Sequence, residues 1–535
     1  MKRKNALLFG LVGFAAFVSG GWLLQRGSDR SGNVYQQARL FENVVAYLSD
    51  YYVDSLDEGH LYDMAIDGML KELNDPYTVF LRKKDLENLT VETTGNYGGL
   101  GIRIEASDGW IQVVAPLPGT PAERVGVQAG DRIVAVNDTS THEWSIDKAV
   151  SKLRGPAGTP AHITIARPGV PDPIPFTIVR ERIHVASIEG GMVLPGGIGF
   201  VRLTQVAESS AQELHDEIER LRKEGAQSLI LDLRYNPGGL LNEGVAVSDL
   251  FLNPGEVVVE TRGRAPGSTG DFKATHPQAW AGMPIVVLVN GSTASAAEII
   301  AGALQDHDRA LIVGTTTFGK GLVQSVVDMG SGQEALKLTT GRWFTPSGRQ
   351  LERPGQTRLY AARTTGADST QSDSTRPKFH TDDGRVVLGG GGITPDDVVR
   401  GDTLTDREKA FAEALGPHVS EYRAAISAYA LDLKGRDAIK SQDFTVTAAM
   451  RQGLVRQMRD RDISLPDSIF AGAAQLLDEQ LGDEIARYDF GRLAEIRRQI
   501  KRDPQVRAAT EMLARAKTPE ELFKLAGQTS PSPAR

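Results

Sequence analysis

The chain has 535 residues, and its 60 Lys and Arg against 68 Asp and Glu give a formal net charge of −8. This length predicts about three or four domains, and the ordinary 40% of hydrophobic residues excludes a wholly disordered chain. The acidic balance argues against nucleic acid as the main partner. Because cysteine is absent, disulfide scaffolds, zinc ribbons, iron–sulfur ligation and a Cys nucleophile are excluded, and no HExxH pattern supports a metal site.

The N-terminal segment, residues 1–27, is typical of an export signal or a membrane anchor. Three cations at positions 2–4 precede an uncharged run, 5–24, which is about long enough to span a bilayer. A cleaved signal peptide is the alternative, although Val18-Ser19-Gly20-Gly21 is a poor cleavage site. In either case we expect the rest of the chain on the periplasmic side of a bacterial inner membrane, anchored there or released.

Beyond this segment, the hydrophobic pattern changes several times along the chain. Apolar stripes at helical spacing come first, then short strands between Gly and Pro turns, and then strands that alternate with helices, which is an α/β signature. Residues 364–383 are typical of an exposed loop, and Thr405 with Glu408 fits a capping box that opens a charged helical region. The predicted regions are a helical region (34–92), a β-rich module (95–183), an α/β core (184–400), a helical extension (404–527) and a disordered tail (528–535).

A glycine loop directly before an alternating strand predicts a peptide-binding site. Glycines let backbone N–H groups converge on a carboxylate, and the strand edge can pair with an extended peptide. Strands near 130–137 and 163–167, with a short helix over 145–153, complete an order that closely resembles a PDZ domain. For the glycines alone, a tight hairpin turn is the alternative. The resemblance implies that the apolar C-termini of polypeptides bind at this loop, near Val150, and the loop residues are Gly99, Leu100, Gly101 and Ile102.

A strand-to-helix elbow places Ser295 where a nucleophile would suit. The continuous apolar run 285–289 predicts a buried strand, and 296–304 predicts the helix that follows it. Backbone N–H groups and the positive end of the helix dipole gather at such an elbow, which suits an oxyanion. The alternative is that Ser295 is simply an N-cap, because Ser295 and Glu298 also fit a capping box.

Lys320 is the candidate base for that hydroxyl. Glycines flank it and a predicted strand, 322–327, follows, so the period of a strand places Lys320 and Gln324 on the same face. No histidine partner is apparent, and a neutral Lys can accept the proton if burial lowers its pKa from about 10.4 by roughly three units. A solvated lysine in a glycine turn is the alternative.

A third motif, LDLRYNPGG over residues 231–239, follows an apolar strand and precedes a helical segment. The backbone N–H groups of Gly238 and Gly239 can point at a carbonyl oxygen and form an oxyanion hole together with the N–H of Ala296. The alternative is an ordinary Pro-Gly turn between a strand and a helix.

Together, the three motifs resemble the carboxyl-terminal processing protease family, the S41 serine peptidases. The family pattern runs LDLRxNPGG, GSxSAxE and FGKGxxQ behind a PDZ domain, and this chain carries LDLRYNPGG, GSTASAAE and FGKGLVQ in that order. The resemblance spans about residues 41–399. It implies that Ser295 is the nucleophile, Lys320 the general base and Gln324 the residue that orients Lys320. It also implies a core fold like crotonase and Clp-type proteases, and hydrolysis without a metal or cofactor.

We therefore expect a multidomain α/β protein that acts as an exported serine endopeptidase, with a PDZ domain that captures apolar C-termini. Two alternatives are a non-catalytic PDZ adaptor or chaperone with a protease-like core, and a crotonase-like acyl-CoA enzyme. A non-catalytic core should have lost Ser295, Lys320 or the glycine turn, and none of these is lost, which argues against the adaptor. An exported chain with a PDZ domain and no basic cluster for CoA argues against the acyl-CoA enzyme. The helices before residue 96 and after residue 405 could form a homo-oligomer or simply cap the core.

Overall fold

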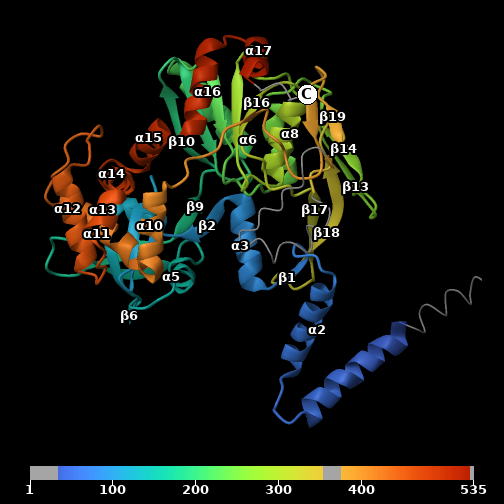
Figure 1. Ribbon diagram of the computed structural model, residues 1–535. Helices are drawn as coiled ribbons and strands as arrows, with labels where there is room; N and C mark the ends of the chain where they lie inside the picture. Colours follow the sequence, from blue (N-terminus) through green and yellow to red (C-terminus); the bar gives the residue numbers. More distant parts are fainter. Residues whose placement is uncertain (1–33, 353–374, 530–535) are drawn as a thin grey trace, which may run out of the picture. The chain divides into compact units, whose positions relative to one another are not determined.

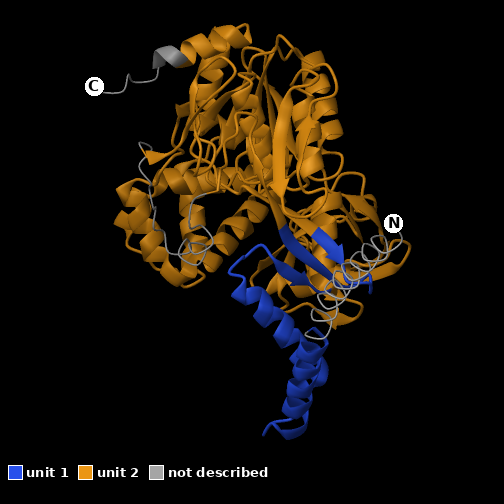
Figure 2. Ribbon diagram, turned by 90° about the vertical axis from the view of Figure 1, so that its right-hand side faces the viewer, with its two compact units in different colours: residues 1–82, 326–339 blue, residues 83–325, 340–535 orange. Residues whose placement is uncertain are grey.

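The computed structural model describes residues 34–352 and 375–529, with side chains described as far as residue 526. The chain divides into two compact units, coloured separately in Figure 2: a smaller unit of residues up to 82 with 326–339, and a larger unit of residues 83–325 and 340 onward. The predicted export or anchor segment, 1–27, lies outside the described residues. Within the described ranges, no helix combines the length and the apolar character needed to cross a membrane.

The smaller unit contains a helix over residues 34–51, α2 (Glu58–Glu72) and β1 (Val79–Leu81). Asp57 caps α2 by accepting from the His60 N–H at 3.0 Å. The region predicted to be helical, 34–92, also contains a strand, because β1 pairs antiparallel with residues 335–337 of β18 (Ala335–Phe344). Backbone hydrogen bonds to this partner strand outweigh the local helical pattern there.

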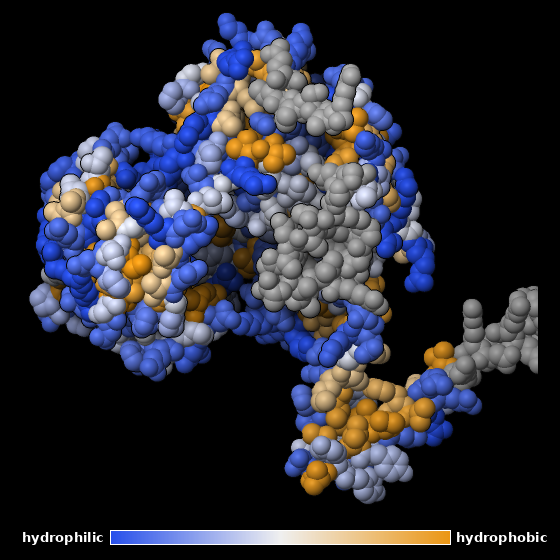
Figure 3. Space-filling model, viewed as in Figure 1, coloured by the Kyte–Doolittle hydropathy of each residue, from blue (hydrophilic) through white to orange (hydrophobic). Residues whose placement is uncertain are grey.

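The helices of the smaller unit leave most of their apolar side chains exposed. Val45 and Leu61 are buried, whereas Leu40, Tyr47 and Met69 are 58%, 68% and 64% exposed. Figure 3 shows the resulting gathering of hydrophobic residues on these helices. The predicted stripes therefore exist, but within the described residues little packs against them.

The β-rich module of the larger unit is a sheet in the order β3-β4-β5-β7-β8, with β6 beside β5. Its core contains fully buried residues from neighbouring strands: Ile111, Ile133 and Ile163. A two-stranded antiparallel ribbon, β2 with β9, leads the chain into and out of the module. Its elements, and the helix α3 before them, are α3 (Lys83–Thr94), β2 (Asn96–Gly99), β3 (Ile102–Ser107), β4 (Trp110–Pro116), α4 (Pro121–Arg124), β5 (Arg132–Val136), β6 (Thr139–Ser140), α5 (Ile146–Leu153), β7 (Pro160–Ala166), β8 (Ile174–Val179) and β9 (Glu181–His184).

The α/β core is built on a sheet in the order β10-β11-β12-β15-β16-β21, parallel except for the pairing of β10 with β11. A second sheet joins β13, β14, β17 and β18, and β19 pairs with β20. The elements are β10 (Ile188–Leu194), β11 (Ile198–Leu203), α6 (Ser210–Lys223), β12 (Ser228–Asp232), α7 (Leu241–Asp249), β13 (Val257–Gly263), β14 (Gly270–Lys273), β15 (Ile285–Val289), α8 (Ala296–Asp306), β16 (Leu311–Gly314), β17 (Leu322–Asp328), β19 (Lys378–His380), β20 (Val386–Leu388) and β21 (Asp397–Val398).

The parallel strands are apolar throughout because both of their faces are covered. On one face, Leu231 and Val287 pack with α6, α7 and α8. On the other, Ile230 and Val286 pack with three helices of the C-terminal extension (Figure 1). The three helices are α15 (Arg492–Arg502), α16 (Pro504–Arg515) and α17 (Pro519–Thr529). This part of the extension therefore covers one face of the core sheet, which was one of the two alternatives predicted for these helices.

The first half of the extension packs against the β-rich module. Leu431 lies so close to Gly130 that a Cβ there would come within 2.3 Å of its Cδ2 atom. Gln112 Nε2 donates to Tyr488 Oη at 2.9 Å, and both residues are buried. This half consists of α10 (Asp406–Leu415), η3 (Gly416–His418), α11 (Val419–Gly435), α12 (Ala448–Arg459), α13 (Asp467–Gly472) and α14 (Ala474–Phe490).

Two predictions of irregular structure were wrong in part. The loop expected over 364–383 contains β19 in its described portion, and β19 pairs with β20 because Phe379 faces Val387 across the hairpin. Arg376 is also buried and donates to the Gly389 carbonyl. The tail expected to be disordered from residue 528 is helical as far as Thr529, where α17 ends. Residues 353–374 and 530–535 lie outside the described residues.

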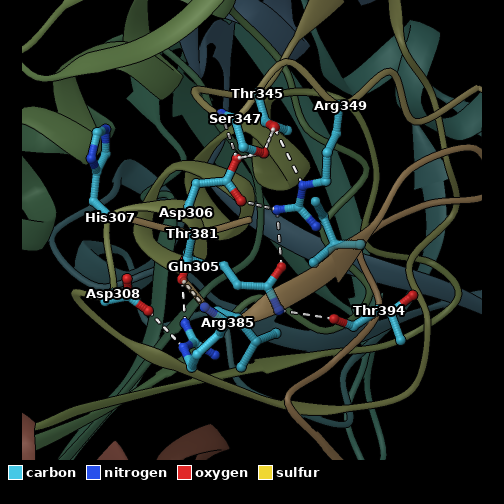
Figure 4. Close-up of polar contacts among 12 residues, drawn as sticks. Gln305, Asp306, His307, Asp308, Thr345, Ser347, Arg349, Thr381, Arg385 and Thr394 are labelled. Atoms are coloured by element: carbon cyan, nitrogen blue, oxygen red, sulfur yellow. Dashed lines mark hydrogen bonds and ion pairs between the residues drawn. The ribbon is translucent and has the colours of Figure 1, made fainter. Parts of the chain in front are cut away.

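A buried polar cluster at the C-terminal end of α8 anchors the segment that follows β18 (Figure 4). The Asp306 carboxylate accepts from Ser347 N–H at 3.0 Å, from Ser347 Oγ at 2.7 Å and from the fully buried Arg349 guanidinium. Gln305 Oε1 also accepts from Arg349, at 3.0 Å. The anchored segment leads to Leu351, whose carbonyl would lie 2.9 Å from a Cβ at Gly319. The cluster thus anchors the segment that packs against Gly319, the residue before Lys320.

His307, next in the chain after that cluster, predicts a pH-dependent stability. Burial lowers the pKa of His307, but the Val257 carbonyl and the Asp382 carboxylate, each 2.7 Å from a ring nitrogen, raise it above the usual value. A raised native pKa stabilises the fold fully below about pH 6.5. That stabilisation is lost as pH rises through the native pKa. We therefore expect the free energy of unfolding of the wild type, measured with urea, to fall as pH rises from about 6.5 through the native pKa of His307.

The test compares His307→Gln with His60→Gln, which replaces a histidine of the smaller unit. We expect the slope of unfolding free energy against pH to flatten in the first variant and to remain in the second. Identical slopes in wild type and His307→Gln would show that His307 stays neutral in the native state.

Candidate active site

The backbone at Ser295 is strained. Ser295 has φ 55° and ψ −120°, between the end of β15 and the start of α8. For a residue with a Cβ, such a conformation costs about 1–3 kcal/mol, and such strain clusters at active sites. An ordinary N-cap has an extended backbone, whereas Ser295 has a positive φ, although Ser295 and Glu298 do form a capping box. The simple N-cap interpretation therefore explains less than a strained elbow that presents the hydroxyl.

One buried carboxylate, Glu298, connects the elbow to the lysine loop. Its Oε2 accepts from the N–H groups of Ser295 and Lys320, each at 2.9 Å. Its Oε1 accepts from Thr317 Oγ1 at 2.5 Å and from Gly319 N–H at 2.7 Å. Burial raises the pKa of Glu298, and these four donors partly offset that effect. The structure therefore brings the backbones of Ser295 and Lys320 to the same oxygen atom.

Lys320 is held from both sides of its peptide unit. The buried Trp343 donates from its indole Nε1 to the Lys320 carbonyl at 3.0 Å, and the backbone N–H of Trp343 donates to the Gly321 carbonyl, also at 3.0 Å. Lys320 is half-buried, and its Nζ donates to Gln324 Oε1 at 3.2 Å, as the period of the strand predicted. The sequence patterns did not indicate the roles of Glu298 and Trp343. The S-x-x-E spacing was the available signal for Glu298, and none pointed to Trp343.

The glycine turn differs from its prediction at one position. Asn236 Oδ1 accepts the Gly238 N–H at 2.8 Å, so this N–H already has a partner. A Cβ at Gly238 would lie 2.7 Å from the Ala296 nitrogen and 2.8 Å from the Ser295 Cβ, so only glycine fits beneath the elbow. The N–H groups of Gly239 and Ala296 make no hydrogen bond to any other described residue. These two remain as candidate oxyanion donors.

Charged side chains buried under the turn were also missed. Asp232 is fully buried, and it accepts from Arg234 Nε at 2.8 Å and from Arg202 Nε at 3.1 Å. Burial raises the pKa of Asp232, but the two guanidinium groups more than offset this, and the pKa lies below its usual value. The LDLR motif contains two of these residues, but a linear motif does not show that they pair.

The peptide loop borders a cavity of about 70 Å³ between β3 and α5. Leu100, Ile102 and Val150 line it, as predicted, and Tyr97 and Arg154 lie at the same cavity. Gly99 does not line the cavity. The N–H groups of Leu100 and Gly101 make no hydrogen bond to the described part of the chain and remain available to a carboxylate. No group of three or more His, Asp or Glu that could hold a metal ion occurs among the described residues.

Comparisons with known proteins agree with this arrangement. Residues 197–358 match peptidase family S41, residues 112–167 match the PDZ domain, and residues 23–85 match the N-terminal domain of the activating protease CtpB. The carboxy-terminal-processing protease of Bartonella bacilliformis is 40% identical over 334 residues, which are 62% of this chain and 76% of that protein. The carboxy-terminal processing protease CtpA of Bacillus subtilis is 35% identical over 327 residues, 61% of this chain and 67% of that protein.

Among solved structures, the photosystem II D1 C-terminal processing protease is 28% identical, with a TM-score of 0.36, and the match covers 67% of this chain and 86% of that one. The strained serine and the lysine joined to it through Glu298 lie in the region that matches family S41, and the α5 side of the peptide cavity lies in the region that matches the PDZ domain. With the 40% identity over three quarters of a relative, they lead to one conclusion: this chain belongs to the carboxyl-terminal processing proteases of family S41, serine peptidases that hydrolyse peptide bonds, and it carries a PDZ domain.

Proposed function

We propose that Ser295 is the nucleophile of this peptidase, that Lys320 is its general base and that Gln324 orients Lys320. The observation that carries this proposal is the shared Glu298 oxygen, which receives the N–H groups of both Ser295 and Lys320 at 2.9 Å. A serine hydroxyl needs a base to become nucleophilic, and a neutral lysine beside it can act as one.

In this mechanism, Lys320 takes the hydroxyl proton as Ser295 attacks the scissile carbonyl carbon. The N–H groups of Gly239 and Ala296 stabilise the oxyanion of the tetrahedral intermediate. Lys320, now charged, gives its proton to the leaving amine, and an acyl-enzyme on Ser295 remains. Water then attacks the ester with Lys320 again as the base, and Lys320 returns the proton to the Ser295 oxygen as the product acid leaves. Each step moves one proton and needs no further cofactor.

A fluorophosphonate probe tests the assignment directly, because it phosphonylates an activated serine. We expect mass spectrometry to find the adduct on Ser295 of the wild type, and labelling of Lys320→Met to be slowed by orders of magnitude. Labelling of another residue, or equal rates in the two proteins, would refute the dyad.

We propose that the PDZ cavity takes the apolar C-terminal residue of a polypeptide substrate, with its carboxylate on the Leu100 and Gly101 N–H groups. Val150→Asp puts a carboxylate into the cavity, so we expect peptides ending in Ala or Val to bind at least about tenfold more weakly. Ser151→Asp, on the exposed side of the same helix, is the matched control. Isothermal calorimetry measures both, and a C-terminally amidated peptide should bind poorly to the wild type. Equal affinities of the wild type, Val150→Asp and Ser151→Asp for the free peptide, and of the wild type for the amidated peptide, would argue against this cavity.

We also propose that the enzyme is exported to the periplasmic side of a bacterial inner membrane. The cations at 2–4 and the uncharged run 5–24 support this proposal. Fractionation followed by mass spectrometry of the mature N-terminus tests it. Full-length protein in the cytosolic fraction would contradict export, and the position of the mature N-terminus separates an anchor from a cleaved signal.

We further propose that the exposed helices of the smaller unit pair with those of a second copy. Large exposed apolar patches mark interaction sites, and Leu40, Tyr47 and Met69 are among the exposed apolar residues of these helices. Sedimentation of wild type and of a Leu40→Ser/Tyr47→Ser variant tests this. A monomeric wild type would contradict the proposal.

A further inference from the structure

The first residues of α16, which belong to the C-terminal extension, contact the charged residues beneath the oxyanion turn. Asp503 is the N-cap of α16, and its Oδ1 accepts from the N–H groups of Gln505 at 2.9 Å and Val506 at 3.2 Å. Its Oδ2 accepts from Arg234 Nη1 at 2.6 Å. One oxygen therefore caps the helix, while the other binds the arginine of the LDLR motif.

Gln505 makes a second contact with the same atom. Its side chain is buried, its Oε1 accepts from Arg234 Nη1 at 2.8 Å, and its Nε2 donates to the Val399 carbonyl at 2.7 Å. On the other side, Nε and Nη2 of Arg234 donate to the two oxygens of Asp232, each at 2.8 Å. The Arg234 guanidinium is thus held between the end of β12 and the start of α16.

The charges of this cluster balance only when the extension contributes. Arg202 and Arg234 carry two positive charges, and Asp232 and Asp503 carry two negative charges. Burial lowers the pKa of Arg234, but Asp232 and Asp503 more than offset this, so the guanidinium stays charged. Without Asp503, the buried Arg234 and the half-buried Arg202 would share the Asp232 carboxylate, and loss of one partner of a buried ion pair leaves an uncompensated charge, which is strongly destabilising.

Arg234 is directly followed by the turn that the proposed mechanism uses. Tyr235 has φ 62° and donates its N–H to Asn290 Oδ1 at 3.1 Å, and Asn236 then binds the Gly238 N–H. The Asn236 carbonyl also accepts from Ala294 N–H at 2.9 Å, beside the nucleophile. A displaced Arg234 therefore displaces the chain that supplies the Gly239 N–H.

We propose that Asp503 and Gln505 are positioning residues for catalysis, which act through Arg234 to hold the oxyanion turn in its productive place. This inference rests on the proposed role of the turn. It gives the extension a part in the reaction besides covering the sheet, where Val506, Ala509 and Leu513 already hold α16 by apolar contacts.

Asp503→Asn is the decisive variant, because Asn caps helices as well as Asp does but presents an uncharged NH₂ group to Arg234 in place of the carboxylate oxygen. We expect kcat on a fluorogenic peptide to fall between about 10- and 100-fold, as a misplacement of about 1 Å can cause, with KM within about twofold. A peptide aldehyde, whose adduct oxygen occupies the oxyanion site, should lose affinity by a similar factor. Asp503→Glu, which keeps the charge, should restore part of kcat. Asp443→Asn removes the carboxylate of an exposed ion pair with Lys501 in the same extension and is the control.

A purely structural role would lower the melting temperature and leave kcat per folded molecule and aldehyde affinity unchanged, and that result would overturn the proposal. If Asp503→Asn does not fold, Gln505→Met, which keeps the charge balance, gives the same measurements and the same two outcomes. The proposed function is tested separately by fluorophosphonate labelling of Ser295. Labelled Ser295 together with a fully active Asp503→Asn would refute the positioning role alone.

Discussion

Ser295→Ala should lower kcat for unfolded casein and for a fluorogenic peptide by about 10⁴- to 10⁶-fold, the loss that follows removal of a nucleophile that acts in a catalytic unit. Lys320→Met should lose about as much, since a hydroxyl without its base is hardly more reactive than water. Both variants should keep their affinity for C-terminal peptides, because the PDZ cavity lies on separate elements, β3 and α5.

Two matched variants test whether a Ser→Ala or a Lys→Met substitution elsewhere in the core also lowers activity. Ser292→Ala replaces an exposed serine of the same turn, and Lys378→Met replaces an exposed lysine of β19. Both should cleave casein at the wild-type rate. If Ser295→Ala and Lys320→Met cleaved casein as fast as these controls, the nucleophile and base would lie elsewhere in the chain.

Glu298→Gln should reduce kcat by about 10²-fold, with little change in KM. The carboxylate accepts from three backbone N–H groups and one hydroxyl, whereas an amide has a single acceptor oxygen and would turn its NH₂ toward N–H groups. We expect the elbow and the lysine loop to separate, and a misplacement of about 1 Å costs roughly this factor. Glu408→Gln is the matched control, because Glu408 holds the same capping-box position in exposed α10.

The same residue predicts an acid limit of activity. Because burial raises the pKa of Glu298, its carboxylate is protonated at a higher pH than that of an ordinary glutamate. A protonated oxygen accepts poorly, so kcat should fall as pH decreases through this raised pKa. The pH profile of kcat measures this fall, which should be less steep in Glu298→Gln, where only protonation of the base Lys320 still lowers kcat. If kcat of Glu298→Gln fell at acid pH as it does in the wild type, the fall would be due to another titratable group.

Local patterns predicted the parts of the site that neighbours in sequence build. The apolar run before Ser295 predicted β15, and the strand period predicted the contact of Lys320 with Gln324. The Gly238 N–H could not be assigned, because its partner, Asn236, is available only in the folded turn. The roles of Asp503 and Trp343 were missed for a related reason: each acts across a long separation in the chain, and an amphipathic or aromatic pattern does not identify its partner.

The position of α16 and α17 bears on how the enzyme comes into being. The strand face that carries Ile230 and Val286 is completed by Val506 and Leu522, close to the end of the chain. While α16 and α17 are not yet docked, that face of the sheet stays open, and contacts between segments so distant in the chain form late in folding. We therefore expect peptide hydrolysis to begin only after α16 has docked, because Asp503 then reaches Arg234 beside the oxyanion turn.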